Sequence, residues 1–528
     1  DADSTSEVEE NNNCNGDNVE ASNGDCDNDY NSDDNDNNGD NNNIDNSDKN
    51  SNTMSPSDTT IFWSPLSAQY QPRLKVSADR TPVILNESIN RSSDYLDVWL
   101  QIFPRSLLMY IAQCTNIRLD ILRREKKINI ADTDHSEILL VLGVTLVMCY
   151  NRVPNFSDYW STHSSLGNEA IKNAISRNRC QMLLSKLYFA NPDKGESSSK
   201  TYYIDDVICC LKKTFQKARE DSPFQSIDES MTKFKGRSSL KQYLPMKPIK
   251  RGIKIWERCD SKTGYIYDLD VYSGKDLEEK SDQRRTLGER VVLKLVESVR
   301  RSDVTLAFDR FFTSVRLVDT IQYAAVGTCI SNRRNMPKFD GKLEKGQYQH
   351  MANTSGTIAA RWKDSKEVLV LSNCHRANDI QVLRKKKDGS KDNVPCPESI
   401  AFYNEIMGGV DLSDQKVGTY DFNRKSQKWW RKVFFKVLMM SVVNSWILYQ
   451  ETKTKRFSYW TVKRKRTSGR PTPASKLMLN VGDHLPVEGN TRRRCVRCSK
   501  LKKETRTKTL CTMCKLPLCK NCFAPYHT

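Results

Sequence analysis

The feature that most constrains the fold of this chain is a change of hydrophobic period after Pro223. Before it, residues 94–217 carry apolar side chains at helical spacing, which predicts a bundle of helices, one of them over 168–189. After it come three strand-like runs, two of which flank a turn at Lys262-Thr263-Gly264. Helices and strands are then expected to alternate, at 291–299, 304–308, 317–325 and 328–331. The predicted order is therefore three antiparallel strands followed by helix, strand, helix and strand.

Three aspartates stand at the borders of these elements. Asp228 lies in Ser-Ile-Asp-Glu-Ser-Met and Asp309 in Leu-Ala-Phe-Asp-Arg-Phe-Phe, each after an apolar run, and Asp411 lies in Gly-Gly-Val-Asp-Leu-Ser-Asp, where a helix is expected to begin. The first two are 81 positions apart, which is room for a hairpin and one helix, but the next 102 positions exceed one strand and a turn. An insertion over 333–400 is therefore expected. This order and spacing predict an α+β multidomain chain with a ribonuclease-H-like catalytic core.

A fold that brings these carboxylates together would need divalent cations to offset their charge. Hard oxygen ligands favour Mg²⁺ or Mn²⁺, and two such ions can clamp the attacking and leaving oxygens of a phosphoryl displacement. Asp414 follows Asp411 by three positions, so on a helix both can reach one metal. An alternative is that the strand-terminal aspartates only form turns and that Asp411 caps its helix. We favour cutting and joining of nucleic acid, with Asp228, Asp309 and Asp411 catalytic and Asp414 a further metal ligand.

The charge of the chain favours a polyanionic partner. The formal net charge is +18, yet residues 1–50 hold 16 Asp/Glu and one Lys, so the remainder carries 82 Lys/Arg against 49 Asp/Glu. Such a surplus predicts salt-dependent binding to nucleic acid, with scattered solubilising lysines as the alternative. Lys254 and the pair Lys247/Lys250 are candidate phosphate contacts; a solvated strand face is the equal alternative.

A second basic segment mixes cations with aromatic rings. It contains Arg424, Lys425 and Lys428, followed by Trp429 and Trp430. A tryptophan on a basic surface can stack on unpaired bases, which is worth about 1–3 kcal/mol per base, whereas a tryptophan that begins an apolar helix is more often part of the core. We expect one of the two rings to stack on a base and the other to be buried.

The C-terminal cysteines form the sharpest local signal. Paired Cys-x2-Cys spacing lets two thiolates from one turn hold a tetrahedral Zn²⁺. A segment this short needs a bound metal to fold. The zinc is expected to be structural. Two cross-braced zincs would need an eighth ligand, for which His484 is the other histidine nearby; one complete site with a three-ligand remnant is the alternative. The seven candidate ligands within 33 residues are Cys495, Cys498, Cys511, Cys514, Cys519, Cys522 and His527.

Composition divides the chain into segments. No secretory signal is visible and the apolar stretch 137–150 is too short to span a bilayer, so we expect reduced cysteines and no membrane partner. The run Lys463-Arg464-Lys465-Arg466 is typical of a nuclear-import signal and predicts a nuclear location. We expect a disordered acidic tail (1–60), a two-part helical domain (90–220 with 421–452) and a two-part catalytic domain (221–332 with 401–420). The insertion (333–400), a basic linker (453–490) and a zinc-binding domain (491–528) complete the chain.

Several segments resemble the piggyBac family of DNA transposases. The resemblance covers roughly residues 90 to 528 and implies that the three aspartates named above are the catalytic ones. It puts Asp414 at a further acidic position of the family and Trp429 at a family tryptophan near the active site. The motifs, in family order, are Asp228-Glu229-Ser230-Met231, Lys235-Gly236-Arg237, Tyr243 to Lys254, Leu287-Gly288-Glu289-Arg290, Asp309 to Ser314, Tyr403-Asn404, Gly408 to Asp411 and the Cys-rich tail.

The resemblance implies cut-and-paste transposition by a homodimer on double-stranded DNA, without a small-molecule cofactor. A nicked 3′ strand would form a hairpin at the transposon end, and the reopened end would join a TTAA target. The helical segments would serve dimerisation and DNA binding, and the Cys-rich domain would read the terminal inverted repeats. Two other classes stay open: a domesticated, catalytically silent DNA- or chromatin-binding relative, and a tail that acts as a histone reader or ubiquitin-ligase module.

Overall fold

The structure is a computed structural model. Three predicted features lie outside the residues that it describes: the acidic tail 1–60, residues 454–485 of the basic linker with His484 and the import signal, and the side chain of His527. The described ranges are 61–66, 70–78, 83–126, 129–163, 165–191, 199–245, 247–274, 285–385, 389–420, 422, 424–453, 486–501, 503–512 and 514–527.

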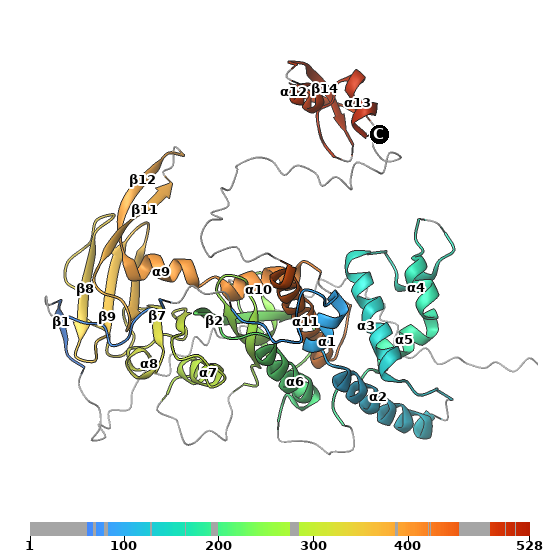
Figure 1. The fold of residues 1–528 in the computed structure, drawn as a ribbon, viewed down its shortest axis with the longest axis horizontal. Coiled ribbons are helices and arrows are strands. Elements are labelled where there is room, and N and C mark those ends of the chain that lie inside the picture. Colours follow the sequence, from blue (N-terminus) through green and yellow to red (C-terminus); the bar gives the residue numbers. More distant parts are fainter. Residues whose placement is uncertain are drawn as a thin grey trace, which may run out of the picture. The chain divides into compact units, whose positions relative to one another are not determined.

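Residues 95–218 form a helical unit, and a late helix completes its core (Figure 1). The long helix α11 (Trp429–Lys453) packs beside α1 and α6 in one hydrophobic core, so residues far apart in the sequence are buried together. The earlier elements are α1 (Tyr95–Ile102), α2 (Arg105–Lys126), α3 (His135–Tyr150), η1 (Phe156–Trp160), α4 (Glu169–Ala174), α5 (Arg177–Lys186) and α6 (Tyr202–Ala218).

Side-chain caps set the starts of these helices. Asp94 and Asp97 form a capping box at α1, and the Asp134 side chain accepts a backbone hydrogen bond at the start of α3. The single helix expected over 168–189 is wrong. α4 and α5 are separate helices because Ile175 adopts an extended backbone and the Ser176 side chain caps α5.

A mixed, ten-stranded sheet follows the helical unit, in the order β1-β8-β9-β10-β7-β6-β2-β4-β3 with β5 paired to β4. β2, β4 and β5 are antiparallel, and the β4–β5 turn uses Gly264 at φ +70°. β6 and β7 then add in parallel beside β2. The predicted succession of three antiparallel strands (β2, β4 and β5), helix, strand, helix and strand is confirmed, with the short β3 as a further strand that was not predicted. The last helix and the last strand both begin and end earlier than the expected 317–325 and 328–331. Its elements are β2 (Phe224–Lys233), β3 (Lys241–Tyr243), β4 (Arg251–Asp260), β5 (Ile266–Val271), α7 (Leu287–Val296), β6 (Thr305–Phe308), α8 (Val315–Thr320) and β7 (Ala324–Cys329).

The predicted insertion 333–400 contributes further strands to this same sheet. β10 pairs antiparallel with β7, and β9, β8 and β1 continue outward from it. β11 and β12 pair only with each other and form a separate hairpin (Figure 1). The strands of the insertion are β8 (Tyr348–Asn353), β9 (Ile358–Lys363), β10 (Glu367–Ser372), β11 (Asp379–Lys385) and β12 (Lys391–Pro397). The edge strand β1 (Trp63–Pro65) comes from the segment before the helical unit.

Helices cover both faces of the sheet. Along β6, Leu306 and Phe308 belong to a core with α7 and α8, whereas Ala307 belongs to a core with α9 (Glu398–Ile406). This alternation follows from the two-residue period of a strand. The next helix, α10 (Gly409–Gly418), packs on β2, β4 and α11.

α11 has the length and composition of a membrane-spanning helix, with a mean hydropathy of 1.3 in its most apolar window. Within the structure, 72% of that window is buried. A single helix of this kind is weak evidence for a membrane span, because the core helices of folded proteins pass the same test.

The C-terminal module has its own small core. β13 (Pro486–Arg494) pairs antiparallel with β14 (Arg506–Cys511), and two helices, α12 (Val496–Lys500) and α13 (Lys520–His527), accompany them. Three cysteines and Leu518 form the buried centre of this module.

The approach of α10 to β2 leaves no space for a side chain at Gly409. An added Cβ would lie 2.5 Å from Ser226 Oγ and 2.8 Å from the Asp260 carbonyl oxygen. Gly409→Ala should therefore lower the free energy of unfolding by about 1–3 kcal/mol in a urea titration. Gly408→Ala is the matched control, because a Cβ there meets nothing within 4 Å. Equal effects of the two substitutions would contradict the close approach.

Candidate metal centres

β2 and β6 bring the first two aspartates side by side. The strands are parallel, and their last paired residues are Ile227 and Phe308. Asp228 and Asp309 come directly afterwards, so they hold equivalent positions on neighbouring strands. Equivalent residues of adjacent strands project from the same face, and adjacent strands lie about 4.8 Å apart.

α10 brings the third aspartate to the same region. Gly409 packs against Ser226, which lies two residues before Asp228 and therefore on the same face of β2. Asp411 lies in the first turn of α10. The charges of all three aspartates act on the Tyr403 hydroxyl of α9. The structure thus gathers the three predicted aspartates around one place.

Burial makes it costly to ionise the first two carboxylates together. Asp228 is 8% exposed, and burial with the charges of Glu229 and Asp309 raises its pKa to about 8, although Lys247 opposes the shift. Burial likewise raises the pKa of Asp309, and the Glu229 charge acts in the same direction. Such a group of acids is stabilised by a bound cation.

The Lys247 ammonium group supplies positive charge beside these acids. Its Nζ lies 3.4 Å from Asp228 Oδ2 and 3.3 Å from Glu229 Oε1, and it donates to the Glu229 carbonyl oxygen at 3.1 Å. Burial opposes the charged form of Lys247, but the charges of Asp228, Glu229 and Asp411 outweigh burial and raise its pKa. One positive charge therefore already compensates the acids.

A second lysine lies beside two aromatic rings next to the acids. Lys254 Nζ is 4.4 Å from the ring centroid of Trp256 and 5.2 Å from that of Phe311. Burial lowers the pKa of Lys254, while the nearby carboxylates act in the opposite direction. The Phe311 backbone N–H also donates to Asp309 Oδ1 at 2.8 Å. Phe311 therefore orients the second aspartate and covers the lysine.

The sequence did not predict two residues of the carboxylate site, Glu229 and Tyr403. Glu229 directly follows Asp228, so its position in the Asp-Glu-Ser-Met motif was the available signal. Tyr403 accepts a hydrogen bond from Thr328 Oγ1 at 3.3 Å, and burial with the aspartate charges raises its pKa to about 12. Its motif, Tyr403-Asn404, gave no indication of which side chains it would meet.

The donor set fits a hard divalent cation. The acids contributed by β2, the end of β6 and α10 offer carboxylate oxygens, which Mg²⁺ and Mn²⁺ prefer. Among the described residues, however, no three carboxylates have oxygens within 4.8 Å of one another, and only a cysteine group meets that distance. A bound ion would draw the acids together and replace the compensating charge that Lys247 supplies.

Asp414 has a different partner. Its Oδ1 accepts a hydrogen bond from Lys436 Nζ of α11, in an ion pair. The expectation that Asp414 shares a metal with Asp411 stays a prediction.

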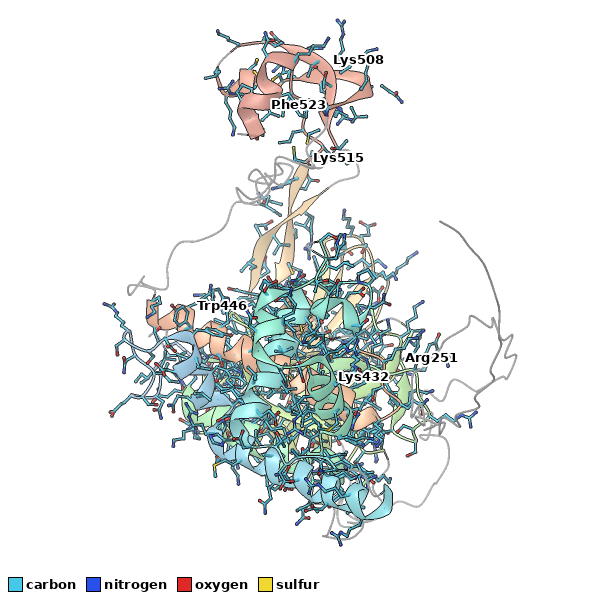
Figure 2. The ribbon with its side chains drawn as sticks, turned by 90° about the vertical axis from the view of Figure 1, so that its right-hand side faces the viewer. Arg251, Lys432, Trp446, Lys508, Lys515 and Phe523 are labelled. Carbon is cyan, nitrogen blue, oxygen red and sulfur yellow. The ribbon has the colours of Figure 1, made fainter. Side chains whose placement is uncertain are left out.

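The candidate phosphate contacts on the surface differ in accessibility. Lys250 and the neighbouring Arg251, labelled in Figure 2, are exposed at the start of β4. Lys425 and Lys428 are also exposed, before α11. These cations can reach a nucleic-acid backbone, and their contact with DNA stays a prediction.

The two adjacent tryptophans have different surroundings. Trp430 is 5% exposed, so its ring belongs to the core and offers no free face to a base. Trp429 is half-buried against the same core, and its stacking on a base stays a prediction. Arg424 is half-buried as well, with its guanidinium group over the Phe156 ring. The rings around Trp430 are those of Tyr188, Phe189 and Tyr203.

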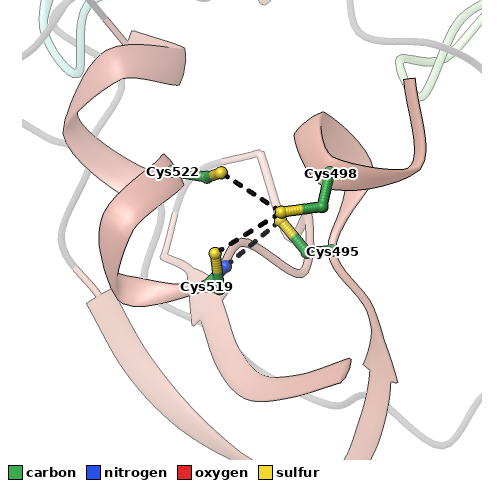
Figure 3. A group of neighbouring side chains, drawn as sticks. All are labelled: Cys495, Cys498, Cys519 and Cys522. Atoms are coloured by element: carbon green, nitrogen blue, oxygen red, sulfur yellow. Dashed lines mark hydrogen bonds between the residues drawn. The ribbon is translucent and has the colours of Figure 1, made fainter. Parts of the chain in front are cut away.

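The C-terminal cysteines form a second candidate centre (Figure 3). The Sγ atoms of Cys495, Cys498, Cys519 and Cys522 all lie within 4.8 Å of one another. The Cys519 backbone N–H donates to Cys495 Sγ at 3.3 Å. Burial opposes ionisation of Cys495, but backbone donors outweigh it and lower its pKa to about 7. Four thiolates at this spacing fit a tetrahedral Zn²⁺.

The middle Cys-x2-Cys pair lies outside this group. Cys511 and Cys514 are neighbours, since burial and then the Cys511 thiol raise the pKa of Cys514. The charge of Cys514 also acts on Tyr526, the residue before His527. The complete four-cysteine site therefore combines the first and third pairs.

Comparison with known proteins identifies the class of protein. Residues 96–446, more than half of the chain, match the family model described as Transposase IS4. The chain therefore belongs to this transposase family, and its relatives identify the piggyBac type within it.

Two human relatives and one solved structure support this assignment. PiggyBac transposable element-derived protein 3 of Homo sapiens is 25% identical over 423 residues, which cover 74% of this chain and 70% of that protein. PiggyBac transposable element-derived protein 2 of Homo sapiens is 27% identical over 340 residues, covering 62% of this chain and 57% of that protein. The cryo-EM structure of the piggyBac transposase synaptic complex with hairpin DNA matches with a TM-score of 0.62 and 23% identity. That match covers 84% of this chain and 98% of the other, and it shows a shared fold.

The raised pKa of Asp228 predicts pH-dependent stability. Its ordinary value of 3.8 rises to about 8 in the folded chain, so the folded state binds this proton more tightly and loses stability as pH rises from about 4 to 8. With a chelator present, Asp228→Asn should therefore raise the free energy of unfolding at pH 8 and change it much less at pH 5. Urea titrations at both pH values measure this difference. An effect of equal size at both would contradict the shift.

The four-cysteine group predicts a zinc ion that depends on each thiol. Cys498→Ala should lose about one zinc per chain in atomic absorption measurements of the purified protein, because three thiolates leave a tetrahedral site incomplete. Cys209→Ala, an exposed cysteine of α6, should keep the full zinc content. Unchanged zinc in Cys498→Ala would rule out this site.

Proposed function

We propose that this chain is a metal-dependent, cut-and-paste DNA transposase. The proposal rests on Asp228, which is buried, and Asp309, which is half-buried, directly after the last paired residues of β2 and β6, with Asp411 close by, in a chain of a transposase family. Two Mg²⁺ or Mn²⁺ ions held by these acids would stabilise the negative charge that develops on the phosphoryl group.

The catalytic unit is proposed to be ribonuclease-H-like, with residues 221–332 and 401–420. The strand order β5-β4-β2-β6-β7, antiparallel and then parallel, supports this assignment. Residues 333–400 would be its insertion, and 90–220 with 421–452 the dimerisation and DNA-binding domain. The C-terminal module would recognise the transposon ends.

The side chains around the acids have tasks that follow from their positions. The Phe311 N–H holds the Asp309 carboxylate in one orientation. Lys247 and Lys254 present ammonium groups beside the acids, where they can donate to the oxygens of an entering phosphate. The Trp256 and Phe311 rings lie within cation–π distance of Lys254 Nζ and favour its charged form.

The proposed substrate is double-stranded DNA, cut at terminal inverted repeats and joined at TTAA by a homodimer in the nucleus. The basic charge of the chain supports a DNA partner. The likeness to a transposase described in a synaptic complex with hairpin DNA supports a hairpin intermediate. The TTAA target, the dimer and the nuclear location rest on the family resemblance and the basic run Lys463-Arg464-Lys465-Arg466.

The names of the human relatives favour a second candidate function. Both are called transposable element-derived proteins, which is the description of a domesticated relative. A domesticated chain would bind DNA or chromatin without cutting it. A wild-type protein that binds terminal-repeat DNA with Mg²⁺ but gives no hairpin would support this function instead.

Loss of a metal ligand should separate cutting from binding. With Mg²⁺ and a TTAA-flanked terminal-repeat duplex, Asp228→Asn and Asp309→Asn should reduce hairpin product on a denaturing gel by more than about 100-fold. Retention of the same DNA on a native gel should stay near wild type, because both substitutions remove metal ligands and no phosphate contact. Asp120→Asn on α2 is the matched control and should cut normally. Equal losses of binding and cutting would instead indicate a structural role for the two aspartates.

A further inference from the structure

Helix α10 presents two acids on one side, and they have different partners. Asp411 acts on Lys247 and Tyr403 at the carboxylate site. Asp414, nearly one turn later, is ion-paired with Lys436 of α11. Lys436 is 9% exposed, so it is a buried lysine whose charge needs a fixed partner.

A buried acid, Glu257, faces the same lysine. Glu257 of β4 is fully buried and is the cross-strand neighbour of Asp228 in the β2–β4 pairing. Burial raises the pKa of Glu257 to about 7, and the Lys436 charge is the largest effect that opposes this shift. The Ser230 hydroxyl of β2 donates to the Glu257 carboxylate. Lys436 therefore lies between Asp414 of α10 and Glu257 of β4, the strand paired with the Asp228 segment of β2.

The other contacts of α10 fix its two ends. At the start, Gly409 touches Ser226 and the backbone of Asp260. Near the end, Lys416 Nζ donates to the Thr263 carbonyl oxygen at 2.7 Å. These contacts hold the axis of α10 on the sheet. The buried residues Val410, Ser413 and Val417 turn one side of α10 to the core, and the ion pair of Asp414 with Lys436 is the charged contact on its acidic side.

We propose that Lys436 is a positioning residue of the carboxylate site: by holding Asp414, it adds to the packing that sets the rotation of α10 and so directs Asp411 towards Asp228 and Asp309. Asp414 is then an anchor and not a metal ligand. This inference rests on the proposed function, because it assigns Lys436 a part in forming the same metal site.

A competing account makes the opposite prediction. If Asp414 were a metal ligand, Lys436 would compete with the metal for its oxygens, and removal of Lys436 would tighten metal binding. If Lys436 positions α10, its removal lets Asp411 turn away, and metal binding weakens. The sign of the change in metal affinity therefore decides between the two.

The test uses Mn²⁺ binding to the full chain, measured by calorimetry. Lys436→Met should weaken the Mn²⁺ affinity about 10–100-fold, the range typical of residues that orient metal ligands. Lys436→Arg keeps the charge and should recover most of the affinity. Lys432→Met is the matched control one turn earlier on α11 (Figure 2) and should bind Mn²⁺ as wild type does. The Mg²⁺ concentration for half-maximal hairpin formation should rise in parallel, at unchanged DNA retention.

Unchanged or tighter Mn²⁺ binding in Lys436→Met overturns the inference while the proposed function stands. A wild-type chain that binds no Mn²⁺ at the acids overturns both. Lys436→Gln, which keeps a hydrogen-bond donor of similar reach, replaces Lys436→Met if the latter does not fold. It is judged by the same change in affinity.

Discussion

The constraint on which the rest of the structure depends is the removal of two neighbouring carboxylates from water. Asp228 and Asp309 each directly follow the last residue paired between β2 and β6, and burial with acidic neighbours raises the pKa of Asp228 to about 8. Buried acids this close need compensating positive charge. Lys247 and Lys254 supply part of it from the loop after β3 and from β4, and carboxylate oxygens suit divalent ions for the remainder.

The third carboxylate depends on packing between distant parts of the chain. Asp411 comes from α10, which Gly409 brings into contact with β2 and which Asp414 connects to Lys436 of α11. α11 in turn belongs to the core of the helical unit that begins at α1. α11 therefore connects the helical unit to the carboxylate site, within one core that also includes residues of β4, β5 and α10. The arrangement gives the helical unit a direct part in shaping the site.

The sequence predicted those features that arise from local patterns. Short apolar runs with turn residues between them gave the strand order after Pro223, and Asp228 and Asp309 were found because each follows such a run. Features set by tertiary contacts were not predicted. The extension of the sheet from β7 to β10 has no local pairing signal, and the hairpin of the C-terminal module determines which cysteine pairs meet. Glu229 and Lys436 carry common residue types, and only their neighbours in space give them a role.

The central claim is that the three aspartates of β2, β6 and α10 hold divalent ions together. An experimental structure of the full chain with Mn²⁺, using anomalous scattering to locate the metal, tests it most directly. The account predicts manganese peaks within bonding distance of Asp228, Asp309 and Asp411, with Lys247 moved off the acids and Asp414 still on Lys436. Saturating Mn²⁺ with no peak among these acids would contradict it.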